Sequence, residues 1–218
     1  MPRLLDLFCG RWGWSRAFAK RGWGIVGVDL VRPSEVPDGY RFEQRDVLDL
    51  DVNWAKSWMP DFIVASSPCE QFSVHGMRMF HPNPPYPELG IKLFNHTRQL
   101  CESAGVPYVM ENVRAAQQFV GRAVHHCGPF YLWGSGVPVI MPQGIKKGID
   151  IGGSQVVKSL SRAEITAYRK QFDMMWSSSK SKERAANTAK VATIPPELAN
   201  CVADYAERIL EQRHLAEG

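Results

Sequence analysis

The sequence has no long apolar run and no clustered cysteines, and each absence excludes a class of protein. No uninterrupted apolar stretch approaches the roughly 20 residues of a membrane-spanning helix, so we expect no membrane association. The first residues lead into a strand-like run without a basic and apolar leader, so no secretory signal is expected. The five cysteines include no C-x-x-C pair, which argues against a disulfide framework and favours a reducing cytoplasm.

The sequence also carries only a small excess of positive charge. A formal net charge of +4 over 218 residues permits nucleic-acid binding without arguing strongly for it. The hydrophobic fraction of 44% is ordinary for a globular protein, and the length suits one domain with a small appendage. No internal repeat is present. We therefore look for function in local motifs.

Strand-like and helical segments alternate over the first half of the chain. This order indicates βαβ units and a mostly parallel sheet, so we expect an α/β fold. Open sheets of this kind bind ligands beyond the carboxyl ends of their strands. The predicted strands are 4–8, 25–30, 61–66 and 108–110, the predicted helices are 14–21 and 90–103, and 41–50 is read as an acidic turn.

The second half of the chain differs from the first in its predicted secondary structure. Residues 121–182 predict a small region of strands and loops, with a helix near 162–176. A closing helix is predicted from Pro196, since proline suits a first turn. Four residues share its apolar face and are expected to pack on the sheet: Leu198, Val202, Tyr205 and Ile209.

A glycine-bearing turn follows the first predicted strand in D-L-F-C-G-R-W-G, residues 6–13. Glycines at such a turn let the backbone approach a ligand closely, but the third glycine of a dinucleotide fingerprint is missing. On this fragment alone, a tight connection between strand and helix is the favoured reading. Asp29 ends the second strand, where an acid can bind ribose hydroxyls, and Asp46 could accept a hydrogen bond from an adenine amino group.

Two further motifs place a thiol and an acid at predicted strand ends. The first is S-S-P-C-E-Q-F-S, residues 66–73, in which Cys69 lies in a polar loop where a thiolate can reach substrate. The second is M-E-N-V, residues 110–113, in which a partly desolvated Glu111 can donate a proton. A thiol and an acid at adjacent strand ends suit attack on an electron-poor ring.

These four motifs, in this order, resemble the cytosine-5 DNA methyltransferase family. The resemblance covers residues 4–114, and I-P-P-E-L-A at 194–199 is similar to the family's closing helix. It implies a Rossmann-like methyltransferase fold that uses S-adenosylmethionine and releases S-adenosylhomocysteine. The residues that it implies for cofactor binding are Phe8, Gly10, Trp12, Gly13, Asp29, Leu30, Asp46, Val47 and Pro68.

The same resemblance implies covalent catalysis on a cytosine flipped out of the duplex. Cys69 would attack carbon 6 of the ring, and Glu111 would contact ring nitrogen 3 and the exocyclic amine. Residues 71–86 would form a mobile loop that closes over DNA, with Arg78 and His81 as phosphate or groove contacts. The substrate-binding residues that it implies are Gln71, Ser73, Arg78, Asn112 and Arg122.

The sequence departs from the family's pattern at several positions. The usual P-P-C-Q reads S-P-C-E, which adds the carboxylate of Glu70 beside the thiol. An arginine-rich motif expected after E-N-V is absent, so Arg114 or Arg122 would have to supply its cation. No metal is expected, because the adjacent residues His125, His126 and Cys127 cannot all face one ion in a strand.

The resemblance also implies how the chain is divided and with what it interacts. Residues 1–120 would form the cofactor-binding and catalytic domain, 121–185 a reduced target-recognition region, and 186–218 the closing helix. So compact a form resembles methyltransferases of bacteriophages and prophages. Double-stranded DNA in a bacterial or phage-infected cytoplasm is the implied substrate, and modification of viral DNA or restriction-modification the implied purpose.

Three alternatives remain open at this point. The same chemistry could act on RNA, since a flipped cytosine differs in the two polymers only in its sugar. The chain could instead bind the cofactor without catalysis and regulate another enzyme. A partner chain could also supply target recognition.

Overall fold

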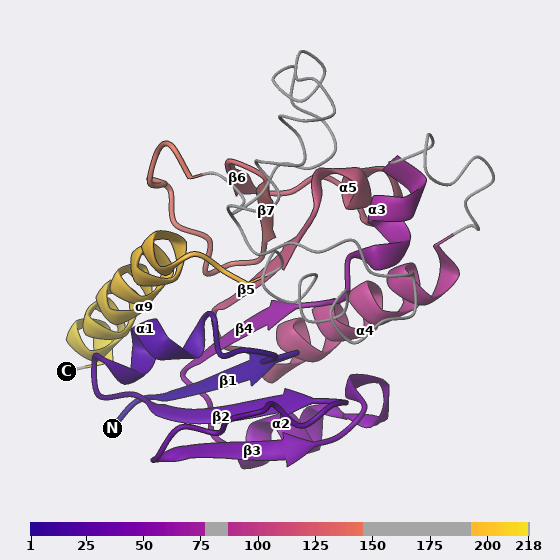
Figure 1. Cartoon of the computed structure of the whole chain (residues 1–218). Helices are drawn as coiled ribbons and strands as arrows, with labels where there is room; N and C mark the ends of the chain where they lie inside the picture. The colour runs from indigo at the N-terminus through magenta and orange to yellow at the C-terminus, as the bar shows by residue number, and fades with distance from the viewer. Residues whose placement is uncertain (77–86, 146–192, 218) are drawn as a thin grey trace, which may run out of the picture. The chain divides into compact units, whose positions relative to one another are not determined.

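The computed structural model of the chain describes residues 1–76, 87–145 and 193–217. Apart from Thr193, these residues belong to one compact unit that joins 1–145 to 194–218. Within it lies a seven-stranded sheet with the order β3-β2-β1-β4-β5-β7-β6 (Figure 1). The strands are β1 (Arg3–Leu7), β2 (Gly24–Asp29), β3 (Tyr40–Gln44), β4 (Phe62–Ser66), β5 (Tyr108–Asn112), β6 (His125–Cys127) and β7 (Phe130–Trp133).

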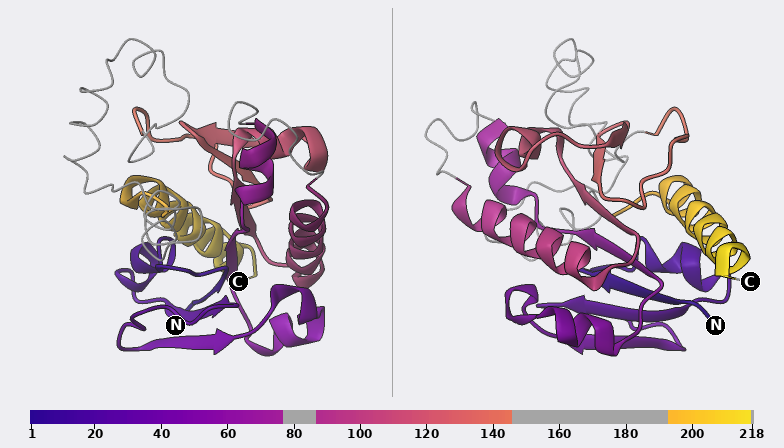
Figure 2. Two further views of the ribbon diagram at one scale, coloured as in Figure 1. Left: turned by 45° about the vertical axis from the view of Figure 1, so that its right-hand side comes forward. Right: turned by 180° about the vertical axis from the view of Figure 1, so that it is seen from behind.

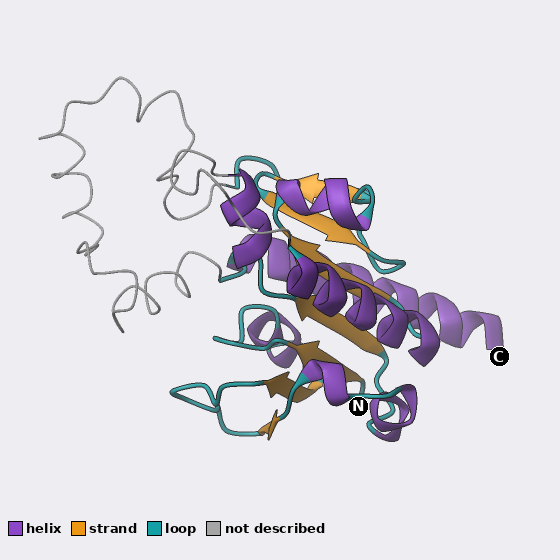
Figure 3. Cartoon of the chain, turned by 90° about the vertical axis from the view of Figure 1, so that its right-hand side faces the viewer, coloured by secondary structure: helices purple, strands orange, loops and turns teal. Residues whose placement is uncertain are grey.

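The sheet is mostly parallel, which confirms the predicted α/β, Rossmann-like fold. Strands β1 to β5 run the same way, β7 is antiparallel to β5, and β6 is antiparallel to β7. The carboxyl ends of β1 to β5 therefore lie at one edge of the sheet. In Figure 1, β1, β2 and β3 point toward this edge, and Figure 3 shows the chain with this edge facing the viewer. The strand order reverses between β1 and β4, where folds of this kind bind ligands.

Helices cover both faces of the sheet (Figure 2). The described helices are α1 (Ser15–Ala19), α2 (Val52–Ser57), α3 (Glu70–Gly76), α4 (Glu88–Ala104), α5 (Gln117–Val120) and α9 (Pro196–Glu217), with 3-10 turns η1 (Val47–Asp49) and η2 (Arg114–Ala116). Helices α1 and α9 contribute to one apolar cluster, and α2 to α5 contribute to the other. In the part of the chain that the structure describes, no helix has the length and apolar character to cross a bilayer.

The alternation of side chains along each strand divides the core into two clusters. In β1, Leu4 packs on the α1 and α9 side, whereas Leu5 and Leu7 pack on the opposite side. Strands buried on both faces read as continuous apolar runs. This is why β1, β2, β4 and β5 could be recognised in the sequence.

Two expected turns or loops prove to contain regular structure. The segment read as an acidic turn begins with strand β3, whose side chains Tyr40 and Phe42 face the core while Arg41 and Glu43 lie on the other face. It is an edge strand, so its charged residues obscured the pattern. The expected loop 71–86 is also wrong in its first part, because Gln71–Gly76 is helical in α3. Arg78, His81 and the helix expected near 162–176 lie outside the described residues.

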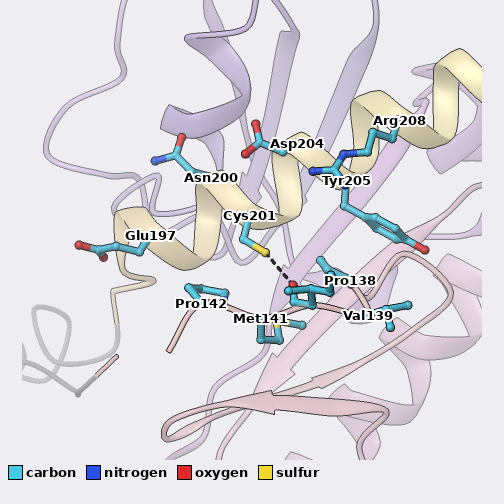
Figure 4. Close-up of a pocket in the computed structure, with 11 residues that line it drawn as sticks. Pro138, Val139, Met141, Pro142, Glu197, Asn200, Cys201, Asp204, Tyr205 and Arg208 are labelled. Carbon is cyan, nitrogen blue, oxygen red and sulfur yellow. Dashed lines mark hydrogen bonds between the residues drawn. The ribbon is translucent and has the colours of Figure 1, made fainter. Parts of the chain in front are cut away.

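The closing helix is confirmed, but its buried face differs in part from the expected one. Leu198 and Val202 are fully buried, and Ile209 packs against the same cluster. The remaining contacts come from small residues, Ala199, Ala203 and Ala206. Tyr205 instead lines a cavity of about 460 Å³ between α9 and the loop Pro138–Pro142, shown in Figure 4. None of the predicted site residues lines this cavity.

Candidate active site

The turn that follows β1 has an unusual backbone. Phe8, Gly10 and Trp12 have positive φ values of 60°, 45° and 62°. Side chains rarely adopt this conformation, and such residues concentrate at functional sites when the surrounding structure enforces them. Two contacts hold the turn: Trp12 N–H donates to the Cys9 carbonyl at 2.7 Å, and Cys9 N–H donates to the Val28 carbonyl at 3.0 Å.

Asp29 ties this turn to the end of β2. Its Oδ2 accepts the Gly10 N–H at 3.0 Å, and its Oδ1 accepts the Val31 N–H at 3.1 Å. The side chain is half-buried, and Leu30 beside it is exposed. The carboxylate is thereby fixed at the carboxyl edge of the sheet, where sequence reasoning expected it to bind ribose.

A second carboxyl group, Asp6, lies inside the sheet near this turn. It is 1% exposed, its Oδ2 accepts the Ser15 hydroxyl, and its Oδ1 is buried without a hydrogen-bond partner. Burial raises the pKa of Asp6 to about 7, and repulsion from Asp29 adds to this rise. Sequence reasoning gave Asp6 no role, although a lone acid between leucines was a visible signal.

Trp12 and Gly13 pack within the protein at this end of the sheet. The indole of Trp12 is buried over Gly27, makes an edge contact with Tyr40 at 5.2 Å, and donates its N–H to the Glu35 carbonyl. Gly13 leaves room for Ile194, which a Cβ atom would approach to 3.0 Å. Cofactor contacts by these two residues remain predictions.

Asp46 and Val47, which are predicted to contact the cofactor's adenine, follow the end of β3. Asp46 is half-buried and caps η1 by accepting the Leu48 N–H at 2.9 Å. Val47 beside it is 2% exposed and joins the core. Both follow β3 at the same edge as Asp29, since β2 and β3 are parallel with Asp29 opposite Gln44.

The predicted nucleophile and acid follow neighbouring strands. Ser66, the last residue of β4, is paired with Glu111 in β5, about 4.8 Å away across the sheet. Cys69 is half-buried three residues beyond Ser66, and its carbonyl accepts the Ser73 N–H at the start of α3. Glu111 is 7% exposed. The fold therefore brings the two ends that carry the thiol and the carboxyl group together.

Asn112 holds the loop that carries Cys69. Its Nδ2 donates to both the carbonyl and the hydroxyl of Ser67 at 3.0 Å, and its Oδ1 accepts the Val113 N–H. The residue is fully buried, so these contacts occupy its amide. Its evident role is to position the S-P-C loop, a role that sequence reasoning missed.

The residues predicted to contact substrate lie on several different elements. Gln71 is bound to the neighbouring helix, because its side-chain carbonyl accepts the Gly90 N–H at 2.7 Å. Ser73 lies in α3 and is half-buried, Pro68 is exposed in the loop, and Arg122 is exposed before β6. Arg114 is exposed directly after the end of β5. Contacts of these residues with substrate remain predictions.

The thiols of the other four cysteines lie where ionisation is disfavoured. Burial raises the pKa of the Cys9 and Cys101 thiols above their ordinary range, and it raises those of Cys127 and Cys201 as well. Cys201 also donates to the Ile140 carbonyl. A thiol with a raised pKa forms little thiolate at neutral pH. Among the described residues, no three His, Cys, Asp or Glu side chains are grouped to hold a metal.

The acids at this edge fit a cofactor that carries positive charge and hydroxyl groups. S-adenosylmethionine has a sulfonium, an ammonium group and a ribose. The fixed carboxylate of Asp29 suits ribose hydroxyls, and the unpartnered oxygen of Asp6, once ionised, suits a positive charge. The antiparallel β7 between β5 and β6 also separates this sheet from the 3-2-1-4-5-6 order of dinucleotide-binding folds.

Comparison with known proteins finds likeness only among solved structures. No family model matches the chain, and no curated protein matches it. The Dnmt2 methyltransferase of S. pombe is 15% identical over 54% of this chain and 36% of its own, with a TM-score of 0.39. A DNMT2 mutant of Spodoptera frugiperda is 22% identical over 54% of this chain and 37% of its own, with a TM-score of 0.36.

An oxidoreductase is also among the similar structures. The imine reductase of Myxococcus stipitatus, solved with NAD+, is 14% identical over 100% of this chain and 62% of its own, with a TM-score of 0.30. In each case the chain spans less than two thirds of the matched protein. Because proteins of one fold differ in activity, a functional conclusion must rest on the site.

Proposed function

We propose that the chain transfers a methyl group from S-adenosylmethionine to carbon 5 of cytosine in DNA, with Cys69 as the nucleophile. The observation that carries this proposal is the register of β4 and β5. It pairs Ser66 with Glu111 and so sets the loop of Cys69 beside the acid. Asn112 fixes that loop through Ser67.

In the proposed reaction, the thiolate of Cys69 forms a bond to carbon 6 of the cytosine ring. Glu111 holds a proton at ring nitrogen 3, so that the electron pair released by this attack makes carbon 5 nucleophilic. S-adenosylmethionine, when bound, supplies an electrophilic methyl group and leaves as S-adenosylhomocysteine. Loss of the proton on carbon 5 then returns an electron pair to the ring and expels the Cys69 thiolate.

The cofactor would be held by the turn after β1 and by the ends of β2 and β3. Asp29 would accept the ribose hydroxyls, and Asp46 would accept the adenine amino group. The free oxygen of Asp6 would attract the positive charge. These proposed roles rest on three carboxylates carried by β1 and by the carboxyl ends of the neighbouring β2 and β3, on one side of the strand switch between β1 and β4.

Double-stranded DNA is the proposed substrate, and the target cytosine would leave the stack. Displacing the base costs a few kcal/mol, which contacts at the site must offset. We propose residues 121–185 as a reduced target-recognition region. Recognition by so short a segment favours a short target, or a partner chain that completes it.

Covalent trapping tests this proposal. DNA with 5-fluorocytosine at the target retains the adduct, because fluorine at carbon 5 cannot leave as a proton does. The wild-type chain with S-adenosylmethionine should form a stable protein–DNA adduct, and Cys69→Ser should form none. Cys201→Ser, which changes another half-buried cysteine, is the matched control and should be trapped like the wild type. Absence of an adduct with every DNA offered, despite measured cofactor binding, would contradict the proposal.

A further inference from the structure

The hairpin of β6 and β7 extends along the sheet edge that carries the proposed active site. Asn112, the last residue of β5, is paired with Tyr131 in β7, and Tyr131 is paired with His126 in β6. Because β7 is antiparallel to β5, its first residue and the preceding turn at Gly128 and Pro129 lie beyond the end of β5. The tip of the hairpin therefore lies at the same edge of the sheet as the Cys69 loop, with β5 between them.

Two aromatic rings are stacked on this hairpin. The imidazole of His126 and the ring of Tyr131 have centroids 5.0 Å apart and an interplanar angle of 16°. His126 is exposed, and its Nδ1 lies 3.3 Å from the Gly128 carbonyl, which fixes the ring. Tyr131 is half-buried and packs against the core on its other side. The His126–Tyr131 stack thus presents a prepared aromatic surface.

The stretch of sequence that forms this hairpin and its flanking loops carries no acidic residue. No Asp or Glu occurs from Val113 to Ile145, whereas exposed arginines occur at Arg114 and Arg122. Arg114 lies two residues beyond Asn112, at the same edge. The segment is therefore net positive, which favours contact with a polyanion, and aromatic rings within such a surface are typical of contacts with nucleic-acid bases. One exposed carboxylate, Glu70, lies at the start of α3, the helix that contacts the η2 turn of Arg114.

We propose that the β6–β7 hairpin binds the DNA strand beside the target cytosine. A neighbouring base stacks on the His126–Tyr131 stack, and Arg114 contacts a phosphate. This inference rests on the proposed function, because that function places DNA at this edge. It adds a specific interaction surface formed by residues outside the cofactor and catalytic sets.

Equilibrium binding to DNA tests the hairpin separately from catalysis. The full chain is titrated against a labelled duplex with one mispaired cytosine, which is readily displaced, at several salt concentrations. His126→Ala should weaken binding about fivefold or more, since a stacked base is lost. Arg114→Gln should lower the slope of log K against log salt by about one. Arg208→Gln, at an exposed arginine of α9, is the matched control and should change neither quantity.

Methyl transfer is recorded on the same preparations, so the two proposals can fail separately. Unchanged affinity in His126→Ala together with an unchanged salt slope in Arg114→Gln would overturn the hairpin proposal, even if the wild type methylates DNA. Tighter binding to RNA of the same sequence would overturn it too. Both expected changes in a chain that transfers no methyl group would support the DNA surface and contradict the proposed reaction.

Discussion

At the scale of the residue, burial moves the titration of Asp6 into the neutral pH range. Its buried carboxyl has a pKa of about 7, against an ordinary value of 3.8. A carboxyl whose pKa is raised on folding makes its full contribution to stability below its unfolded pKa. That contribution is lost as the pH rises from about 4 through 7.

Asp6→Asn should therefore gain stability relative to the wild type as the pH rises. Asparagine cannot ionise and can still accept the Ser15 hydroxyl. We expect the difference in unfolding free energy, variant minus wild type, to increase by roughly 1–3 kcal/mol between pH 5 and pH 8. Urea denaturation at the two pH values measures it. A difference that does not change with pH would show that Asp6 is not buried as described.

The ionisation of Asp6 also determines how we expect cofactor binding to depend on pH. An ionised Asp6 attracts a cationic ligand and a protonated one does not, so the affinity for S-adenosylmethionine should rise as the pH increases through 7. Isothermal titration calorimetry from pH 6 to pH 8 measures this, and Asp6→Asn should flatten the profile. A wild-type profile no steeper than that of the variant would remove Asp6 from the cofactor site.

At the scale of the element, strand β2 requires a glycine at position 27. A Cβ atom at Gly27 would overlap the ring of Trp12, which is buried above it, whereas the nearest atom to one at Gly24 would be the flexible end of Met1 at 3.2 Å. Gly27→Ala should cost about 1–3 kcal/mol of stability and weaken cofactor binding, because Trp12 must move. Gly24→Ala is the matched control in the same strand. Thermal unfolding compares the two variants, and equal losses would contradict this packing.

The contact between β5 and the Cys69 loop can be tested in the same way. Asn112→Ala removes two hydrogen bonds to Ser67 and should cost about 1–3 kcal/mol of stability. It should also lower kcat for methyl transfer while leaving the cofactor Kd nearly unchanged, since the loop, not the cofactor turn, is released. Ser57→Ala, which removes an exposed hydrogen bond to the Trp54 carbonyl, is the control. An unaltered kcat in a folded Asn112→Ala chain would show that the loop is held by other contacts.

The elements recognised in the sequence are those with a local pattern. Strands β1, β2, β4 and β5 are continuous apolar runs, and α4 and α9 have helical periodicity. Strand β3 was missed because its short alternation of Tyr40 and Phe42 with charged residues runs directly into an acidic stretch. The antiparallel insertion of β7 depends on pairing between distant segments. The burial of Trp12 and the orphaned oxygen of Asp6 likewise arise only when separate strands meet.

At the scale of the whole molecule, the strand topology brings four individually weak motifs to one edge of the sheet, where they form a candidate site. The acids after β2 and β3, the thiol after β4 and the acid of β5 are far apart in the sequence and share one edge of the sheet. Any one of them alone fits an ordinary loop. Their common edge is the reason for treating Cys69 and Glu111 as reacting groups rather than as isolated polar residues.

Transfer of labelled methyl is the most direct test of the central claim. The purified chain and its Cys69→Ser variant are incubated with methyl-labelled S-adenosylmethionine and either unmodified DNA or RNA. We predict label on carbon 5 of cytosine in DNA with the wild type, and none with the variant. Label in RNA alone would overturn the substrate. No label in either polymer, from a chain that binds the cofactor, would contradict the claim that this chain is by itself a cytosine methyltransferase.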